Sequence, residues 1–256
     1  MTLYGWDQNE AHILEAKKRK IIDVSCSSLE ESLEVGDWIL LAIPVNSIAS
    51  SLSGMLDVLA SHQLIIDFGS TKEQICKRVA RHKRRGQFIA AHPIAGTEYS
   101  GPGAAFSNLF KDKVMIVCEP EKTNSDFLTA FENQCASLGM AIIYLGAAEH
   151  DAHLAYVSHL SHIIAFGLSH TVLQKEEFAM KILDLAGSGL ASTVRLAKSS
   201  PDMWTPIFIN NRDAILDSLD VYLEKIHDFK ALLTASNAPG IKAYLEKGGE
   251  IKRILK

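Results

Sequence analysis

The sequence predicts an α/β protein in which a mainly parallel sheet, covered by helices, is followed by an all-helical domain. Through the first half of the 256 residues, apolar runs of strand length alternate with amphipathic segments. After about residue 147 the strand-like runs stop and long helical stretches remain. A hydrophobic content of 47% with 22% charged residues is typical of a globular chain with a substantial core. We therefore place one domain over residues 1–147 and a second over 148–256.

Six short apolar runs predict the strands, and they are LYGW (3–6), DWILLAIP (37–44), QLIIDF (63–68), QFIAA (87–91), KVMIVCE (113–119) and MAIIYLG (140–146). Helical spacing of apolar residues predicts helices between several of them, notably at 46–61, 71–85 and 124–138. Strands that are apolar on both faces and separated by helices form parallel sheets covered on both sides. Ligands bind such sheets beyond the carboxyl ends of the strands, so the loops that follow the strands are the first place to look for chemistry.

The first strand ends at an acidic residue, Asp7, and Asn9 is placed to cap a helix over AHILEAKKRK. A carboxylate in this position is typical of the second strand of a dinucleotide-binding unit, where it takes the ribose hydroxyls. In such a unit the first strand and a glycine-rich phosphate turn come earlier, and neither precedes LYGWD in this sequence. We therefore expect an incomplete, N-terminally truncated Rossmann-type sheet.

Three loops, AIPVNSI, DFGSTKE and AAHPIAGTEYSG, follow strands that should end at the same edge of the sheet. In the second loop Gly69, Ser70 and Lys72 stand at a predicted helix start, where the hydroxyl either takes part in chemistry or simply caps the helix. In the third loop His92 follows the strand. Histidine is the side chain best suited to accept a proton near neutral pH, although a lone histidine at a strand end can also be structural.

The second half contains the histidine-rich segment EHDAHLAYVSHLSH, over residues 149–162. On a regular helix His150 and His153 fall on one side and His159 and His162 on the opposite side, so the four cannot surround one metal ion. We predict no metal site, with a two-histidine zinc site as the alternative. One pair is expected to face the ligand and the other to lie at the domain junction. Further along, Arg195 either grips a ligand carboxylate through its planar guanidinium or lies on the surface.

Composition excludes several classes of function. The net charge of −4 is not that of a polyanion-binding protein, and the locally basic run over 72–85 is interpreted as the solvated face of a helix. We therefore expect no nucleic-acid partner. Four scattered cysteines favour reduced thiols over a disulfide framework. No apolar stretch reaches membrane-spanning length, and no signal peptide precedes the first strand, so we expect a cytoplasmic protein that does not enter a membrane.

Taken together, these segments resemble the prephenate/arogenate dehydrogenase family of tyrosine biosynthesis. The matching segments are GWDQN, AIPV, DFGSTK, AAHPIAGTEYSGPGAAFSNLF, EHDAHLAYVSHLSH, STVRLA and SPDMWTPIFINN, and they run nearly from end to end. The order of HPIAGTE, SHLSH, VRLA and PDMW is the most specific part. Two departures are Ser161, where the family usually has proline, and GSGL, where a GGF-like stretch is common.

The resemblance implies a nucleotide-binding domain followed by a helical dimerisation domain, and hence a homodimer. It implies the oxidative decarboxylation of prephenate to 4-hydroxyphenylpyruvate, with hydride transfer to NAD. Asp7 makes NADP the less favoured cofactor because a carboxylate repels its extra phosphate. By the same resemblance His92 and Ser70 are catalytic, the substrate contacts are Arg195, His162, Thr97 and Glu98, and the cofactor contacts are Asp7, Ala42, Pro44, Gly69 and Ser70.

Two alternatives stay open at this point. An arogenate dehydrogenase would differ only in what surrounds the substrate side chain, which the motifs do not distinguish. A non-catalytic dimer would keep the fold without holding the dinucleotide, because the phosphate-binding turn is missing ahead of Asp7.

Overall fold

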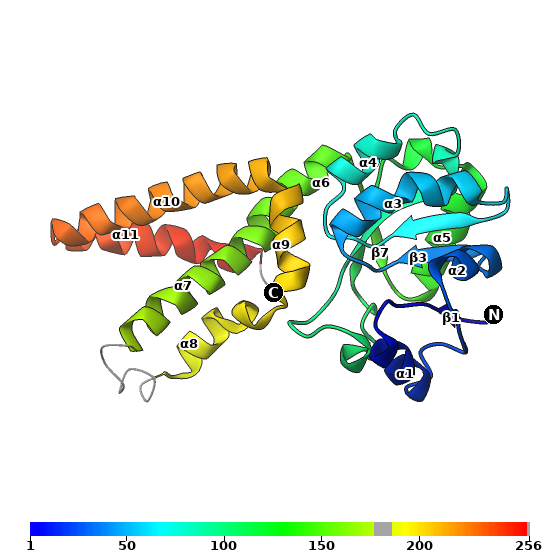
Figure 1. The fold of residues 1–256 in the computed structure, drawn as a ribbon. Helices are drawn as coiled ribbons and strands as arrows, with labels where there is room; N and C mark the ends of the chain where they lie inside the picture. Colours follow the sequence, from blue (N-terminus) through cyan, green and yellow to red (C-terminus); the bar gives the residue numbers. More distant parts are fainter. Residues whose placement is uncertain (177–185, 255–256) are drawn as a thin grey trace.

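A five-stranded sheet forms the centre of the N-terminal domain in the computed structural model, which describes residues 1–176 and 186–254 (Figure 1). The strands lie in the order β3 (Trp38–Leu41), β4 (Leu64–Asp67), β5 (Phe88–Ile94), β6 (Val114–Cys118) and β7 (Ala141–Leu145). All neighbours run parallel except β5 and β6. The predicted mainly parallel sheet is therefore confirmed. The exception arises because β5 and β6 are joined by a loop with only the short helix η2 (Pro102–Ala104), and no helical crossover returns the chain to the other end of the sheet.

The register of the sheet determines where the loops emerge. Leu41 pairs with Asp67 and Asp67 pairs with Ala90, so the carboxyl ends of β3 and β4 lie at one edge. The next strand is longer than predicted, because β5 continues past Ala91 along the antiparallel partner β6. As a result His92 lies within the ladder, opposite Ile116, and does not follow the strand as predicted.

The first strand belongs to a separate small sheet. Here β1 (Tyr4–Gly5) pairs in parallel with β2 (Val24–Ser25), a two-residue strand too short for its pattern to be recognised. Between them α1 (Glu10–Lys18) begins as expected, since the Asn9 Oδ1 accepts a hydrogen bond of 3.0 Å from the Ala11 N–H. The following α2 (Leu29–Val35) is capped by Ser28.

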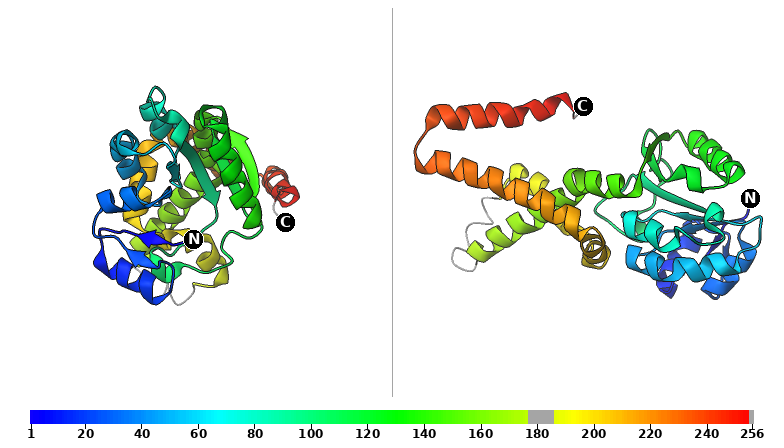
Figure 2. Two further views of the ribbon diagram at one scale, coloured as in Figure 1. Left: turned by 90° about the vertical axis from the view of Figure 1, so that its right-hand side faces the viewer. Right: turned by 90° about the horizontal axis from the view of Figure 1, so that it is seen from above.

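Helices cover both faces of the large sheet (Figure 2). On one face Ile65 packs in a core with α3 (Val45–Val58) and α4 (Glu73–Val79), whereas on the other face its neighbours Leu64 and Ile66 pack with α5 (Ser125–Ser137). Alternation along a strand sends successive side chains to opposite faces, which is why an entirely apolar strand needs both layers. Two short 3₁₀ helices, η1 (Arg85–Gln87) and η3 (Pro120–Lys122), complete this domain.

The described part of the second half is entirely helical, as predicted. Its elements are α6 (Ala147–Leu154), the π-helix η4 (Ala155–His159), α7 (Leu160–Glu176), α8 (Ser188–Thr193), η6 (Arg195–Lys198), α9 (Pro201–Asn210), α10 (Arg212–Thr234), α11 (Ala238–Gly249) and η7 (Glu250–Arg253). A helix is also expected from the sequence over KILDLA (181–186), but all of it except Ala186 lies in 177–185, outside the described residues.

The long helices α7, α10 and α11 extend away from the α/β domain, while α6 and α9 lie against it (Figures 1 and 2). Leu154 of α6 and Trp204 of α9 belong to the same buried cluster as α3, so the two halves of the chain share a core. Among residues 1–176 and 186–254, no helix combines the length and the apolar character that a membrane span requires.

Candidate functional site

Buried hydrogen bonds fix the turn that follows β4. The Lys72 side chain turns inward, and its Nζ lies 2.5 Å from the Asp67 Oδ2, with both side chains fully buried. The Gly69 N–H donates to the Asp67 Oδ1 at 2.6 Å. Burial raises the pKa of Asp67, and the Lys72 ammonium opposes that rise. Since a Cβ on Gly69 would come within 2.9 Å of both Asp67 and Val45, only glycine fits here, and Ser70 is left partly exposed on a rigid turn.

The helix after this turn is capped from the other domain. Asp151 of α6 accepts hydrogen bonds from the Lys72 N–H at 2.8 Å and the Glu73 N–H at 2.9 Å, one on each carboxylate oxygen. A carboxylate at the start of α4 satisfies N–H groups that have no partner within the helix. Ser70 therefore does not cap α4, which is the structural alternative for its hydroxyl, and neither does its neighbour Thr71. The Thr71 hydroxyl is buried and has no hydrogen-bond partner within the described part of the chain.

His92 contacts α6 through a second histidine. Its Nδ1 lies 2.8 Å from the His150 Nε2, and the His150 Nδ1 lies 2.7 Å from the Asp151 Oδ1. Burial lowers the pKa of His92 well below 6.5, and the neighbouring positive charges, including that of Lys72, lower it further. Burial also lowers the pKa of His150, although Asp151 opposes this. His92 is consequently a neutral imidazole at neutral pH, and it keeps one partly exposed side.

Of the two pairs expected for a regular helix, His159 and His162 lie together against Trp204, whereas His150 and His153 are separated. His150 and His159 are both buried, and His153 is exposed. The reason is the π-helical turn η4. A π-helix rotates by a smaller angle per residue than an α-helix, so His159 lies closer to the side of His150 than a regular helix would place it. The Asn211 Nδ2 bridges the two parts of the helix, since it lies 2.7 Å from the Asp151 carbonyl oxygen and 3.0 Å from the His159 Nδ1.

Burial of His159 makes the stability of the protein depend on pH. The pKa of His159 is lowered from 6.5 to about 4, mainly by burial. The unfolded chain therefore binds a proton at a higher pH than the folded chain, so the contribution is complete above pH 6.5 and is lost as the pH falls toward 4. At ~1.4 kcal/mol per pH unit, the loss reaches ~2 kcal/mol at pH 5 and ~3 kcal/mol near pH 4.

Urea unfolding of the parent and of His159→Asn between pH 7 and pH 5 measures the contribution of His159 to the pH dependence of the free energy of unfolding. Asparagine keeps an acceptor for Asn211 but does not titrate, so the free energy of unfolding should fall less steeply with acid in the variant. The matched control is His153→Asn on the same helix, where the exposed histidine should leave the slope unchanged. Equal slopes for the parent and His159→Asn would contradict the prediction.

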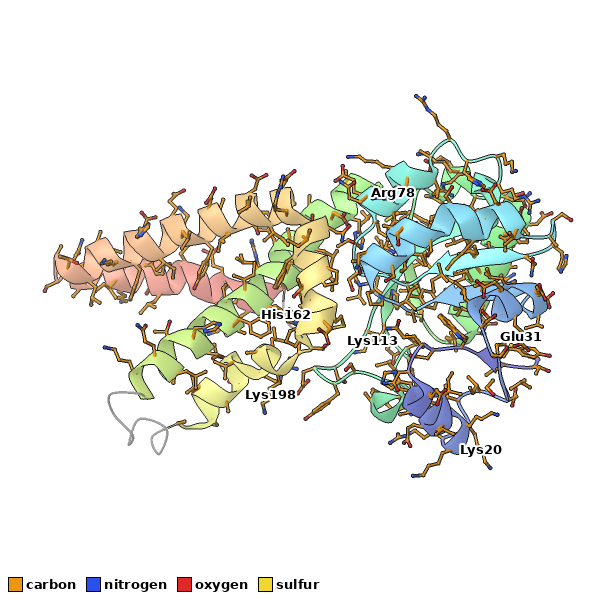
Figure 3. The ribbon with its side chains drawn as sticks, in the orientation of Figure 1. Lys20, Glu31, Arg78, Lys113, His162 and Lys198 are labelled. Carbon is orange, nitrogen blue, oxygen red and sulfur yellow. The ribbon has the colours of Figure 1, made fainter. Side chains whose placement is uncertain are left out.

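Trp204 contacts both His162 and His159. His162 stacks on Trp204 with ring centroids 3.5 Å apart, and the edge of His159 meets the same ring at 5.8 Å. Figure 3 shows His162 on the side of α7 that faces α9. The His162 Nδ1 is 3.0 Å from the Ser158 carbonyl oxygen. Burial lowers the pKa of His162, and the positive charge of the Arg195 guanidinium lowers it further.

The loop after β5 reaches the helical domain through an ion pair. The Arg195 Nη1 donates to the Glu98 Oε2 at 2.7 Å, with the Arg195 side chain 52% exposed. Thr97 is exposed, and its hydroxyl accepts a 3.3 Å hydrogen bond from the Tyr99 N–H. The structure thus connects His92, through its own loop to Glu98 and Arg195 and through His150 to the histidines of the helical domain. Two contacts, His92–His150 and Glu98–Arg195, therefore link the strand β5 and its loop to the helical domain.

The predicted cofactor residues lie on the α/β domain, apart from this junction. Ala42 and Pro44 are exposed just after β3, beside the turn that holds Gly69 and Ser70. Asp7 follows β1 in the small sheet, where its Oδ1 accepts from the Asn9 N–H at 2.8 Å and its Oδ2 lies 3.1 Å from the His12 Nδ1. Asp7 thus follows a strand of the small sheet, whereas Ala42, Pro44 and Ser70 follow strands of the five-stranded sheet and lie beside β4 and β5.

Metal binding finds no support in the described ranges, where no group of three or more His, Cys, Asp or Glu side chains is placed to hold a metal ion. The donors that the zinc alternative would use are engaged elsewhere, since His150 contacts His92 and Asp151.

Sequence reasoning missed three residues of this junction, namely Asp151, Trp204 and Asn211. Asp151 stands between two histidines, in the only histidine-rich segment of the sequence, and that position was a usable signal. Trp204 and Asn211 lie in the family-matching segment SPDMWTPIFINN, but nothing local in it indicated their contacts, because these come from the packing of α9 against α6 and α7.

Comparisons with known proteins agree with this architecture. Residues 1–144 match the family described as prephenate dehydrogenase, nucleotide-binding domain, and residues 146–247 match prephenate dehydrogenase, dimerization domain. The chain is 27% identical to prephenate dehydrogenase of Bacillus subtilis over 95% of its own length and 66% of that protein. It is 24% identical to cyclohexadienyl dehydrogenase of Zymomonas mobilis over 100% of its own length and 88% of that protein.

A solved structure shows the same similarity. The crystal structure of prephenate dehydrogenase from A. aeolicus in complex with hydroxyphenyl propionate and NAD+ superposes with a TM-score of 0.88 at 27% identity, covering 99% of this chain and 88% of that one. The two family matches together account for nearly all of the sequence, and they meet where β7 gives way to α6. The chain belongs to the prephenate dehydrogenase family.

Proposed function

We propose that this protein oxidises and decarboxylates prephenate to 4-hydroxyphenylpyruvate, with NAD as the hydride acceptor. The observation that supports the proposal is the pair of contacts between the two halves of the chain, in which a neutral, partly exposed His92 meets His150 of α6 and Glu98, six residues further along the chain, binds Arg195 of the helical domain. Family membership supports the same reaction, and the A. aeolicus relative binds hydroxyphenyl propionate and NAD+.

Arg195 is proposed to hold a carboxylate of the substrate. Its guanidinium is half exposed and is already oriented by one carboxylate, that of Glu98, so its remaining N–H donors can bind a second anion. His162, stacked on Trp204, and Thr97 with Glu98 in the facing loop are the further substrate contacts that we propose.

His92 is proposed to accept a hydrogen bond from the ring hydroxyl as the carbon that bears it loses hydride. The bond from the opposite ring carbon to the carboxylate breaks, carbon dioxide leaves, and the two bonding electrons enter the ring to make it aromatic. Aromatisation supplies the driving force, so the protein has to orient the ring and share the hydroxyl proton, which returns to the phenol. Ser70, partly exposed on its rigid turn, is proposed to contact the same hydroxyl.

The residues present fit a dinucleotide. The Asp7 side chain is 40% exposed and offers acceptor oxygens for ribose hydroxyls, and its negative charge disfavours NADP. Ala42 and Pro44 are exposed, Ser70 is partly exposed and Gly69 is buried, and all four lie beside the carboxyl ends of β3 and β4, where α/β sheets bind their ligands. When bound, NAD supplies the carbon that takes the hydride.

We also propose a cytoplasmic homodimer, with a nucleotide-binding domain over residues 1–147, a helical domain over 148–256 and no nucleic-acid partner. The dimerization-domain match supports pairing through the helical half. So do the apolar side chains that α10 exposes at helical spacing, namely Leu216, Leu223, Ile226 and Leu233. Light scattering coupled to gel filtration should give twice the 28.1 kDa mass of the chain.

The reaction is tested by titrating the protein with NAD and following reduced cofactor with prephenate and, separately, with arogenate. We expect turnover with prephenate. Turnover with arogenate alone would identify an arogenate dehydrogenase instead, and failure to bind NAD at millimolar concentration would identify the non-catalytic alternative.

The pH dependence of kcat/KM provides a second test of His92. The neutral form is the one that accepts the proton, and burial lowers the pKa of His92 well below 6.5. Activity is therefore expected to persist below pH 6.5 and to fall only as the pH drops through the lowered pKa. Initial rates between pH 8 and pH 5, with circular dichroism at each pH to confirm folding, measure the midpoint. A midpoint at or above 6.5 would show that His92 is not the titrating group.

A further inference from the structure

The hydrogen-bond donors around Asp151 determine which ring nitrogens of His150 and His92 carry hydrogen. Each carboxylate oxygen accepts a backbone N–H, that of Lys72 at 2.8 Å and that of Glu73 at 2.9 Å. Backbone N–H groups can only donate, so both oxygens act as acceptors. The third contact, from the Asp151 Oδ1 to the His150 Nδ1 at 2.7 Å, is then completed by a hydrogen atom on His150.

The same reasoning continues through the two rings. His150 is fully buried and neutral, so a hydrogen on its Nδ1 leaves a lone pair on its Nε2. That Nε2 lies 2.8 Å from the His92 Nδ1, which must therefore be the donor. A neutral His92 with hydrogen on Nδ1 carries its lone pair on Nε2, and among the described residues no side chain or backbone group hydrogen-bonds to that Nε2.

We infer that His150 and Asp151 are positioning residues, which hold His92 in the tautomer whose Nε2 is free to accept the substrate hydroxyl. In a histidine pair of this kind, the hydrogen bond made by one ring nitrogen decides the state of the other. Only the role of the His92 Nε2 atom as acceptor for the substrate hydroxyl rests on the proposed function. The tautomer itself is a property of the free protein.

The arrangement also makes the site depend on docking of the two domains. His92 belongs to β5, whereas His150 and Asp151 belong to α6, and Asp151 at the same time caps α4 directly after the turn that carries Ser70. One carboxylate of the helical domain thus orients His92 through His150 and also caps the helix that follows the turn of Ser70. Separation of α6 from the sheet would release His92 to exchange between its tautomers.

Nitrogen-15 NMR of histidine-labelled protein tests the inference without any substrate. Long-range proton–nitrogen correlations distinguish a ring with hydrogen on Nδ1 from one with hydrogen on Nε2, and the signals of His92 are those missing from a His92→Asn sample. We expect Nδ1–H for His92 in the parent and in His150→Gln, since the glutamine Oε1 can replace the acceptor Nε2. We expect a shift toward Nε2–H in His150→Leu, which has no acceptor.

Kinetics of the same variants provide the second measurement. His150→Leu should lower kcat about 10- to 100-fold with little change in the KM for prephenate, a range taken from the loss of hydrogen-bond partners that orient metal-binding histidines. His150→Gln should recover most of that loss. His153→Leu is the matched control on the exposed side of α6 and should leave both kcat and the NMR spectrum of His92 unchanged.

The outcomes separate this inference from the proposed function. An Nε2–H tautomer of His92 in the parent, or an unchanged tautomer in His150→Leu, would overturn the inference whatever the activity. The predicted tautomers in a protein that does not turn over prephenate would support the inference and count against the proposed function. Should His150→Leu not fold, the parent and His150→Gln spectra still decide the matter.

Discussion

Replacing His92 with asparagine is expected to lower kcat for prephenate by roughly 10²- to 10⁴-fold, the usual contribution of a general base. Asparagine can still hydrogen-bond to His150 from the position of the Nδ1 atom, but it has no basic nitrogen where the Nε2 atom stands. The His150 and Asp151 contacts should therefore survive while proton acceptance is lost. Initial rates at saturating NAD and prephenate measure the effect.

Two controls make this result specific to His92. The dissociation constant for NAD should be unchanged, because the proposed cofactor residues lie after β1, β3 and β4. The same replacement at His153, exposed on α6, should leave kcat at the parent value. A His92→Asn enzyme that works at the parent rate would remove His92 from the catalytic assignment.

Replacing Arg195 with glutamine is expected to raise the KM for prephenate about 10- to 100-fold, with a smaller effect on kcat. A hydrogen bond between charged groups contributes about 1.5–3 kcal/mol, which corresponds to that range. The glutamine retains a donor but loses the positive charge and the planar fork that grips a carboxylate with two N–H groups. Steady-state kinetics over a wide range of prephenate concentration separate KM from kcat.

The conservative variant Arg195→Lys should recover only part of the loss, because lysine keeps the charge without the paired donors. Lys198, exposed on the same 3₁₀ helix, provides a control, and Lys198→Gln should leave the KM near the parent value. If Arg195→Gln and Lys198→Gln changed the KM equally, the effect would be one of general surface charge and the proposed carboxylate contact would be wrong.

The sequence by itself determined the architecture. Apolar runs at 37–44, 63–68 and 87–91 can be buried on both faces only in a sheet covered by helices. After residue 147 the apolar residues recur at helical spacing and no strand-like run follows, which indicates an all-helical second half. These patterns are local, since each depends on residues a few positions apart, and the structure confirms them. Glycine, proline and capping residues likewise marked where helices start, and the capping of α1 by Asn9 is one example. The motif order also identified the family.

Only the tertiary structure decided how the site is assembled. A π-helical turn at Ala155–His159 changed which histidines share a side, and that departure depends on packing between α6, α9 and α10. The contact from Asp151 to the start of α4 spans 79 positions in the sequence, and that from His92 to His150 spans 58. No local pattern encodes such contacts, because hydrogen-bond geometry is determined by where two separately folded elements meet. The pKa of His92 is likewise a product of that meeting, since burial at the junction of the two domains is what lowers it.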